Sequence, residues 1–205
     1  MTYEFGPDRS FSIEYEKVHL LIPFYKYIQG NLVFLELPLL KEYNFSHTAN
    51  YAKGTGKIIK KPDGLYFYTS NGDTFVTNEE SNITFKIENL GEKYSNYKID
   101  DYLLVWAKGR TAEITRIILT NDKKIYSKAK RLEIPVFRNI TILYAGTELG
   151  LWDLDTAKNT YNIWAKDSQA VLPNCDTWEI LIAKHGEIIK NNASYLKDIL
   201  EKIHH

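Results

Sequence analysis

Hydrophobic and polar residues alternate along much of this chain, and the alternation predicts β-strands. The clearest example is Phe-Ser-Ile-Glu-Tyr at residues 11–15, because every second residue of a strand points to the same face of its sheet. Similar short segments, rich in β-branched and aromatic residues, follow at the spacing of an all-β domain. We expect strands at residues 18–28, 32–39, 65–69, 74–77, 82–88, 101–106, 113–120, 132–137, 140–144, 161–165, 178–183 and 188–189.

Turn-forming residues between these segments predict antiparallel hairpins. The sequence Ser-Asn-Gly-Asp at 70–73 separates two of the expected strands, and Asn-Gly is favoured in tight hairpins because both residues tolerate positive φ. Gln-Gly-Asn at 29–31 and Asn-Asp-Lys-Lys at 121–124 are expected to form turns in the same way.

A helical pattern appears only at the C-terminal end. Asn192 is suited to cap a helix. Leu196, Ile199, Leu200 and Ile203 then follow at a spacing that places them on one helical face. We expect this stripe to pack against the sheet.

These elements together predict a mostly β protein. The expected fold is an antiparallel β-sandwich or open barrel, jelly-roll-like, closed by one C-terminal α-helix. Residues 1–205 are expected to form a single β-rich domain, with a weak possible boundary at the polar segment 89–96, which we interpret as a loop.

Charge and cysteine content narrow the classes of function. The 26 basic and 26 acidic residues cancel, so no whole-protein field attracts nucleic acid or an anionic membrane. The single cysteine, Cys175, excludes a disulfide within the chain. No apolar stretch approaches the ~20 residues of a membrane helix, and the first residues lack the pattern of a signal peptide. We expect a cytoplasmic protein without membrane partners.

No strong catalytic motif occurs, and the sequence predicts neither catalytic residues nor a cofactor nor a metal site. The Gly-Thr-Gly-Lys segment at 54–57 lacks the other residues of a phosphate-binding loop. His47 lies beside two hydroxyl residues, but neighbouring residues of a strand point to opposite faces. Cys175 is interpreted as a small buried apolar residue rather than a nucleophile.

A metal-dependent hydrolase or nuclease is kept as one alternative. Asp100 or Asp101, together with Asp122, could hold Mg²⁺, and Lys123 or Lys124 could stabilise charge on a phosphate. The opposing interpretation is that Asp122 and the two lysines simply form a solvated turn.

Clustered basic residues support a second alternative, a nucleic-acid-binding protein. Tyrosines at 51, 66, 68 and 126 are interleaved with them, and a single-strand binder needs cations for phosphates and flat rings for bases. The candidate residues are Lys53, Lys57, Lys60, Lys61, Lys108, Arg110, Arg116, Lys123, Lys124, Lys128, Lys130 and Arg131.

The preferred prediction is a non-enzymatic interaction or assembly module. It rests on the absence of a catalytic constellation and on the many aromatic residues, which are common in protein interfaces. The expected partner is another protein or a second copy of the chain. Nucleic acid is kept as a possible partner.

Overall fold

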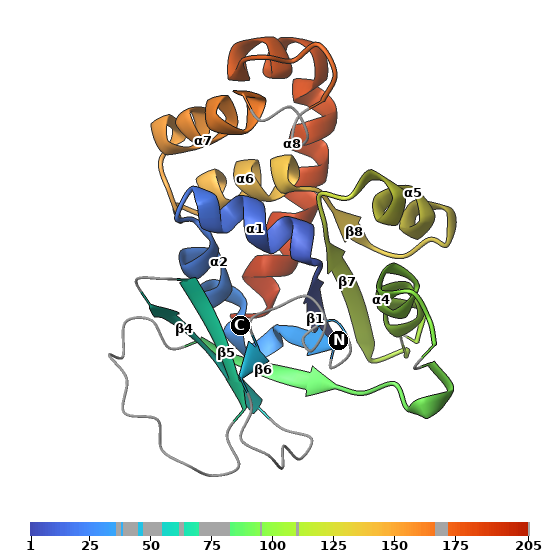
Figure 1. Ribbon diagram of the computed structural model, residues 1–205. Helices are drawn as coiled ribbons and strands as arrows, with labels where there is room; N and C mark the ends of the chain where they lie inside the picture. Colours follow the sequence, from blue (N-terminus) through green and yellow to red (C-terminus); the bar gives the residue numbers. More distant parts are fainter. Residues whose placement is uncertain are drawn as a thin grey trace.

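The computed structural model describes residues 1–35, 38, 45–46, 55–61, 64–69, 83–94, 96–109, 111–166 and 172–204. At 45–46, 55–61, 64–69, 84 and 92 this description covers the backbone alone. The predicted mostly β sandwich or barrel is wrong: these residues contain seven α-helices, and parallel strands form the centre of the molecule. Figure 1 shows helices on both sides of that centre.

The central sheet consists of three parallel strands. They are β1 (Thr2–Pro7), β7 (Ile114–Leu119) and β8 (Val136–Phe137), in the order β1-β7-β8. Glu4 of β1 lies opposite Arg116 of β7 in the register. A parallel bridge between Phe5 and Leu32 places the chain that leads into β2 (Val33–Leu35) on the other side of β1.

A second sheet continues from β2. Its order is β2-β6-β4-β5-β3, with β3 (Phe45–Ser46), β4 (Thr55–Lys61), β5 (Gly64–Thr69) and β6 (Ile83–Glu88). β2 pairs parallel with β6, whereas β4 is antiparallel to both of its neighbours. The predicted strands at 65–69 and 82–88 are therefore confirmed. The predicted turn at 70–73 and the strand at 74–77 lie outside the described residues.

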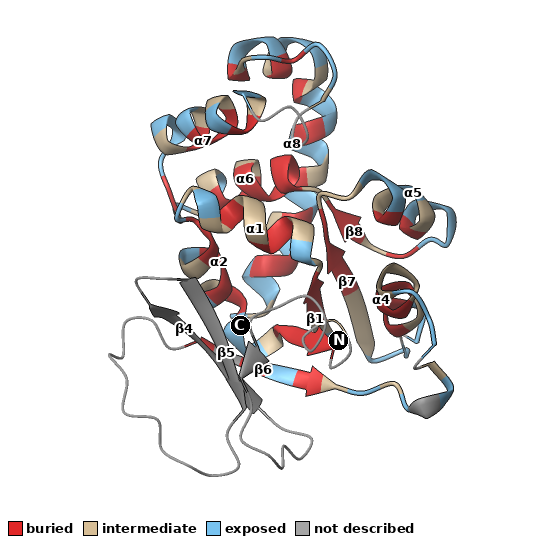
Figure 2. Ribbon diagram, viewed as in Figure 1, coloured by how far each residue is buried: buried red, intermediate tan, exposed pale blue. Residues whose placement is uncertain are grey.

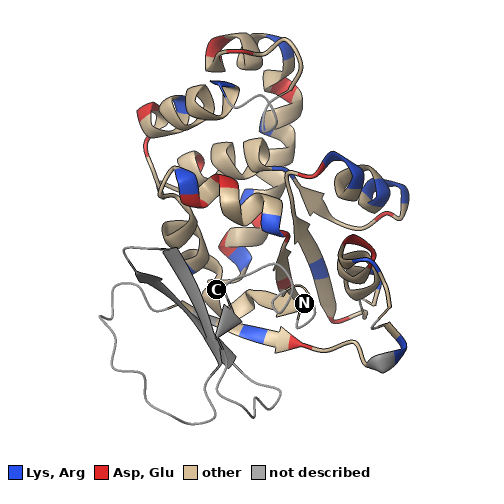
Figure 3. Ribbon diagram, in the orientation of Figure 1, with Lys and Arg blue, Asp and Glu red and all other residues tan. Residues whose placement is uncertain are grey.

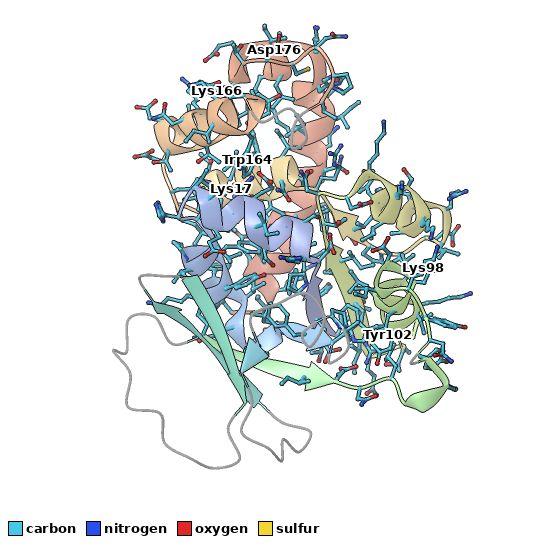
Figure 4. All side chains as sticks on the ribbon, in the orientation of Figure 1. Lys17, Lys98, Tyr102, Trp164, Lys166 and Asp176 are labelled. Atoms are coloured by element: carbon cyan, nitrogen blue, oxygen red, sulfur yellow. The ribbon has the colours of Figure 1, made fainter. Side chains whose placement is uncertain are left out.

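One face of the central sheet packs against the larger group of helices. These are α1 (Arg9–Lys17), α2 (Leu21–Ile28), α6 (Asn139–Glu148), α7 (Leu154–Lys166) and α8 (Trp178–Lys202). Phe5, Ile117 and Leu119 point into this core. Trp164 of α7 lies over α1 (Figure 4), where its Nε1 donates a hydrogen bond to the carbonyl of Glu14 at 3.2 Å.

The opposite face is covered by two helices, α4 (Ile99–Lys108) and α5 (Lys123–Arg131). Ile118 and Val136 point into this smaller core, together with Trp106 of α4. Because Ile117, Ile118 and Leu119 alternate between the two cores, the second half of β7 is buried on both faces (Figure 2). A strand covered by helices on both sides is the pattern of a doubly wound α/β fold.

The predictive errors follow from ambiguous spacing. Phe11 and Tyr15 fit both alternation and a helical face, and both are buried on α1, which Asp8 caps. Short apolar runs cannot distinguish strand from helix by periodicity alone. The segments predicted as strands at 18–28, 101–106, 140–144, 161–165, 178–183 and 188–189 form or enter helices α2, α4, α6, α7 and α8.

Two predicted turns are also wrong. Residues 29–31 form a short 3-10 helix, Gln29–Asn31, before β2, and residues 121–124 lead from β7 into α5. A second 3-10 helix, Glu92–Tyr94, lies between β6 and α4. The C-terminal helix is confirmed, but the predicted cap at Asn192 is wrong: α8 has 25 residues, Thr177 caps its start, and Asn192 lies within it and donates to the carbonyl of Ile188 at 2.9 Å. The single-domain organisation stays a prediction. Within the part of the chain described, no helix is long and apolar enough to cross a membrane.

Candidate functional site

The strand order places a topological switch point between β1 and β7. From β1 the chain passes through α1 and α2 to β2 on one side, whereas from β7 it passes through α5 to β8 on the other. α1 and α5 consequently belong to different cores. In such folds the chain leaves a crevice outside the carboxyl ends of the two strands, and ligands bind there.

Asp8 lies at the carboxyl end of β1 and connects it to β7. Its backbone amide donates to the carbonyl of Leu119 at 2.8 Å. Its carboxylate Oδ2 accepts hydrogen bonds from the Ser10 amide at 3.3 Å, from Thr120 Oγ1 at 2.9 Å and from the Ser10 hydroxyl. Asp8 therefore caps α1 and at the same time holds the ends of two parallel strands together.

Asp122 lies three residues beyond β7 and caps α5. Its Oδ1 accepts from the amides of Lys124 at 2.6 Å and Ile125 at 2.9 Å. Its own amide donates to Ser10 Oγ at 3.0 Å and to Thr120 Oγ1 at 2.9 Å. Ser10 thus joins the two acidic residues, since its hydroxyl donates to Asp8 and accepts from Asp122. We name Asp8, Ser10, Thr120 and Asp122 the strand-end cluster.

Burial changes the acidity of one member of this cluster, Asp8. The pKa of Asp8 is raised above its ordinary value of 3.8, mainly because desolvation disfavours the carboxylate. The hydrogen bonds from Ser10 and Thr120 act in the opposite direction and offset part of this effect. A cation beside Asp8 would offset the remaining cost of desolvation.

A cavity of about 520 Å³ opens at the strand-end cluster. Its size lies within the range of small-molecule binding sites. Acidic, basic and apolar side chains all border it, and they come from α1, from the segments after β7 and β8, and from the chain before α8. The lining residues are Ser10, Ile13, Glu14, Asn121, Asp122, Lys123, Arg138, Leu172 and Pro173. Asp8 does not border this cavity; it borders a separate space of about 10 Å³ between the end of β1, β2 and α4, with room for about one water molecule.

Arg138, directly after β8, supplies a cation to the cavity wall. Its Nη2 donates to Asn121 Oδ1 at 3.4 Å, and its guanidinium lies 5.9 Å from the ring centre of Tyr126. Desolvation lowers its pKa. Among the described residues, buried Nε of Arg138 and buried Oε2 of Glu14 have no hydrogen-bond partner. Buried polar atoms normally have one, so the wall of this cavity is suited to a polar ligand.

The acidic residues that the sequence combines are separated in the structure. Asp101 of α4 binds Lys128 of α5 at 2.8 Å and does not border the cavity that Asp122 lines. Within the described ranges, no group of three or more His, Cys, Asp and Glu residues is close enough to hold a metal ion. Any cation at the strand-end cluster would therefore depend on two carboxylates.

The predicted basic patches are divided between several places. Lys123, Lys124, Lys128, Lys130 and Arg131 lie on α5, where much of the ribbon in Figure 3 is blue. Lys108 ends α4. Lys57, Lys60 and Lys61 belong to β4, where only the backbone is described. Lys53 and Arg110 lie outside the described residues.

Arg116 belongs to a structural ion cluster instead of a binding patch. Its Nε donates to Glu4 Oε2 at 3.2 Å, its Nη2 to Glu88 Oε2 at 3.1 Å and its Nη1 to the carbonyl of Trp106 at 3.0 Å. Trp106 Nε1 in turn donates to Glu88 at 3.0 Å. We name Glu4, Glu88, Trp106 and Arg116 the mid-strand cluster.

Sequence reasoning missed Asp8, Ser10, Thr120, Asn121 and Arg138. The sequence does contain a usable signal, because short polar residues come directly after two short apolar segments. Asp8 ends the sequence Phe-Gly-Pro-Asp at 5–8, and three polar residues end Ile-Leu-Thr-Asn-Asp at 118–122. The signal has meaning only once both segments are known to be adjacent parallel strands. His47 lies outside the described residues. Cys175 is buried, as predicted.

Comparison of the chain with protein-family models, with curated proteins and with solved structures gives no match, so its function is argued from the strand-end cluster and the cavity beside it.

Proposed function

We propose that this protein hydrolyses phosphodiester bonds in nucleic acid with a divalent cation held by Asp8 and Asp122. The observation on which this rests is that the two acidic residues follow adjacent parallel strands at the switch point and that the Ser10 hydroxyl joins the carboxylate of Asp8 to the backbone amide of Asp122. Both properties identify a preformed polar site in the place where doubly wound folds bind ligands.

The chemistry of the surrounding residues favours a phosphate substrate. Mg²⁺ prefers oxygen ligands, and it is commonly held by one or two carboxylates, with water and substrate phosphate oxygens completing its shell. The bonds within the strand-end cluster use Oδ2 of Asp8 and Oδ1 of Asp122. The second oxygen of each carboxylate takes no part in these bonds. Arg138 and Lys123 border the same cavity and provide positive charge for phosphate oxygens.

In this proposal the residues of the chain have separate roles. Asp8 and Asp122 would hold the cation, and the cation would lower the pKa of a water bound to it. Arg138 and Lys123 stabilise the charge that develops on the phosphate oxygens. The water oxygen forms the new bond to phosphorus, the bond to the leaving sugar oxygen breaks, and that oxygen takes up a proton. The products are an alcohol and a phosphate monoester.

The position of α5 supports nucleic acid as the substrate. Asp122 caps α5, and exposed or half-exposed cations follow along the helix: Lys123, Lys124, Lys128, Lys130 and Arg131. Tyr126 lies on the same helix, beside Arg138. Cations along a path to the site attract a phosphate backbone, and a flat ring beside them is suited to stack on a base.

The test is hydrolysis of labelled single-stranded RNA and DNA by the purified protein in Mg²⁺, in Mn²⁺ and in excess EDTA. We expect cleavage only with the metal. Asp122→Asn should reduce the rate by about 100-fold or more with little change in stability, since asparagine also caps helices. The matched control is Asp101→Asn, which changes an acidic residue outside the cavity and should leave the rate unchanged.

Two results would contradict the proposal. One is the absence of cleavage with either metal on both substrates, and the other is an Asp122→Asn variant as active as the original chain. Binding of Mn²⁺, followed by electron paramagnetic resonance, tests the metal site without relying on activity. The interaction module that the sequence favours stays a prediction.

A further inference from the structure

A second cavity lies between α4 and α5, away from the strand-end cluster. It has a volume of about 470 Å³ and shares no lining residue with the first cavity. Leu104, Val105 and Leu132 form its apolar part. Leu132 is 45% exposed although it is a large aliphatic residue. We name this cavity the α4–α5 cleft.

Charged side chains surround the apolar part of the α4–α5 cleft. They are Asp101, Lys108, Lys128 and Arg131. Asp101 is neutralised by Lys128, because the two form an ion pair at 2.8 Å. Among the described residues, neither Lys108 nor Arg131 forms an ion pair. The cleft therefore presents an aliphatic surface with a net positive rim.

We propose that the α4–α5 cleft binds a short acidic segment of a partner protein, which inserts one aliphatic side chain between α4 and α5. The aliphatic side chain would contact Leu104, Val105 and Leu132. Carboxylates beside it in the segment would pair with Lys108 and Arg131. The argument is the complementarity of this apolar surface and positive rim to an acidic, aliphatic peptide.

The lining of the cleft distinguishes this partner from nucleic acid. Single-stranded nucleic acid binds where aromatic rings stack on its bases, whereas the described residues that line the α4–α5 cleft include no aromatic ring. Tyr126, which belongs to α5, does not border the cleft. The two cavities have no lining residue in common and the binding needs no metal, although Lys128 and Arg131 on the rim also belong to the row of cations on α5.

The test uses short synthetic peptides added to the full chain without metal. One peptide has a central leucine between glutamates, the second has serine in place of that leucine, and the third has lysines in place of the glutamates. Methyl NMR signals of Leu104, Val105 and Leu132 report binding in the cleft. We expect the acidic leucine peptide to shift these signals with submillimolar affinity and the other two peptides to bind at least about tenfold more weakly.

Charge reversal at the rim provides the second measurement. Arg131→Glu and Lys108→Glu should each weaken the acidic leucine peptide by about fivefold, and higher salt should do the same. Lys190→Glu is the control, since Lys190 is an exposed residue of α8. The methyl spectrum of each variant without peptide shows whether it is folded.

Three outcomes would overturn this inference. The first is no shift of the three methyl groups at millimolar acidic leucine peptide. The second is equal binding of the serine peptide. The third is a shift of the same three methyl groups by a single-stranded oligonucleotide alone, or by a second copy of the chain as protein concentration rises. The first two outcomes do not bear on Mg²⁺-dependent cleavage, so the two proposals can fail separately.

Discussion

The strand-end cluster and the mid-strand cluster lie on the same two strands, yet their charges are arranged in opposite ways. In the mid-strand cluster, Arg116 lies between Glu4 and Glu88 and donates to both. In the strand-end cluster, two acidic residues meet at hydroxyl and amide groups, and the cation Arg138 is bonded to Asn121 instead. Opposite charges neutralise one another in the first cluster and remain separate in the second.

This difference shows how position along a strand decides what a buried charge does. Glu4 is only 5% exposed and lies in the middle of β1, on the face of the sheet that α4 covers. Its charge must be compensated by the chain itself. Asp8, four residues later, lies where the sheet ends, so a ligand can supply the compensation.

The largest expected effect is on stability, from Arg116→Met. Removing the cation leaves buried Glu4 with Lys86 alone, at 3.4 Å, and half-buried Glu88 with the indole N–H of Trp106, which should lower the free energy of unfolding by about 2 kcal/mol. Urea denaturation measures this loss. Adding Glu4→Gln to the variant should recover part of it. Lys128→Met, which breaks the more exposed pair with Asp101, should cost about 0.5 kcal/mol.

The same variant tests whether the two clusters are separate. Hydrolysis per folded molecule of Arg116→Met should equal that of the original chain. A folded Arg116→Met protein without activity would mean that the mid-strand cluster belongs to the site, and the comparison between the clusters would then be wrong.

The sequence predicted individual elements better than it predicted the architecture. Residues 113–120 were expected to form a strand, and β7 occupies Ile114–Leu119. Leu196, Ile199 and Leu200 were expected on one helical face, and all three are buried on α8. The architecture was missed because β1 was not predicted and because apolar residues 102–106 fit a strand as well as the helix α4 that they form.

The candidate site was partly visible in the sequence. Asp122 and Lys123 were named for the same phosphate chemistry that is proposed above, but Asp122 was placed in a hairpin turn. Its partners Asp8 and Ser10 are more than 100 residues away in the chain, and no local pattern connects them. Pairing of β1 with β7 brings them together, and strand order cannot be deduced from alternation.

An intermediate effect is expected from Asp8→Asn, in the dependence of stability on pH. The pKa of Asp8 is raised in the folded protein. The protonated carboxyl of Asp8 therefore makes its full contribution to the free energy of unfolding below pH 3.8. This contribution is lost as the pH rises through the folded-state pKa of Asp8. Asparagine does not ionise, so the variant should gain stability relative to the original chain across that window. Each tenfold difference in proton affinity between the folded and unfolded states changes the free energy of unfolding by about 1.4 kcal/mol.

Urea denaturation of both proteins over a series of pH values measures this difference. Above the window, Mg²⁺ should stabilise the original chain and leave Asp8→Asn unchanged, because only the original carboxylate can bind the cation. If the difference in stability between the original chain and Asp8→Asn stays constant with pH, burial does not raise the pKa of Asp8. Equal stabilisation of both proteins by Mg²⁺ would remove Asp8 from the metal site.

The smallest expected effect concerns Lys123, the exposed cation that borders the strand-end cavity. If this cavity holds the phosphate backbone, Lys123→Ala should weaken binding of a single-stranded oligonucleotide a few-fold and reduce the slope of log affinity against log salt concentration by about 1. Glu113, at the opposite end of β7, offers a contrast, since Glu113→Gln removes a charge far from the carboxyl end and should leave the slope unchanged. A Lys123→Ala slope equal to that of the original chain would mean that phosphate does not enter this cavity, so the separated charges of the strand-end cluster would need another ligand.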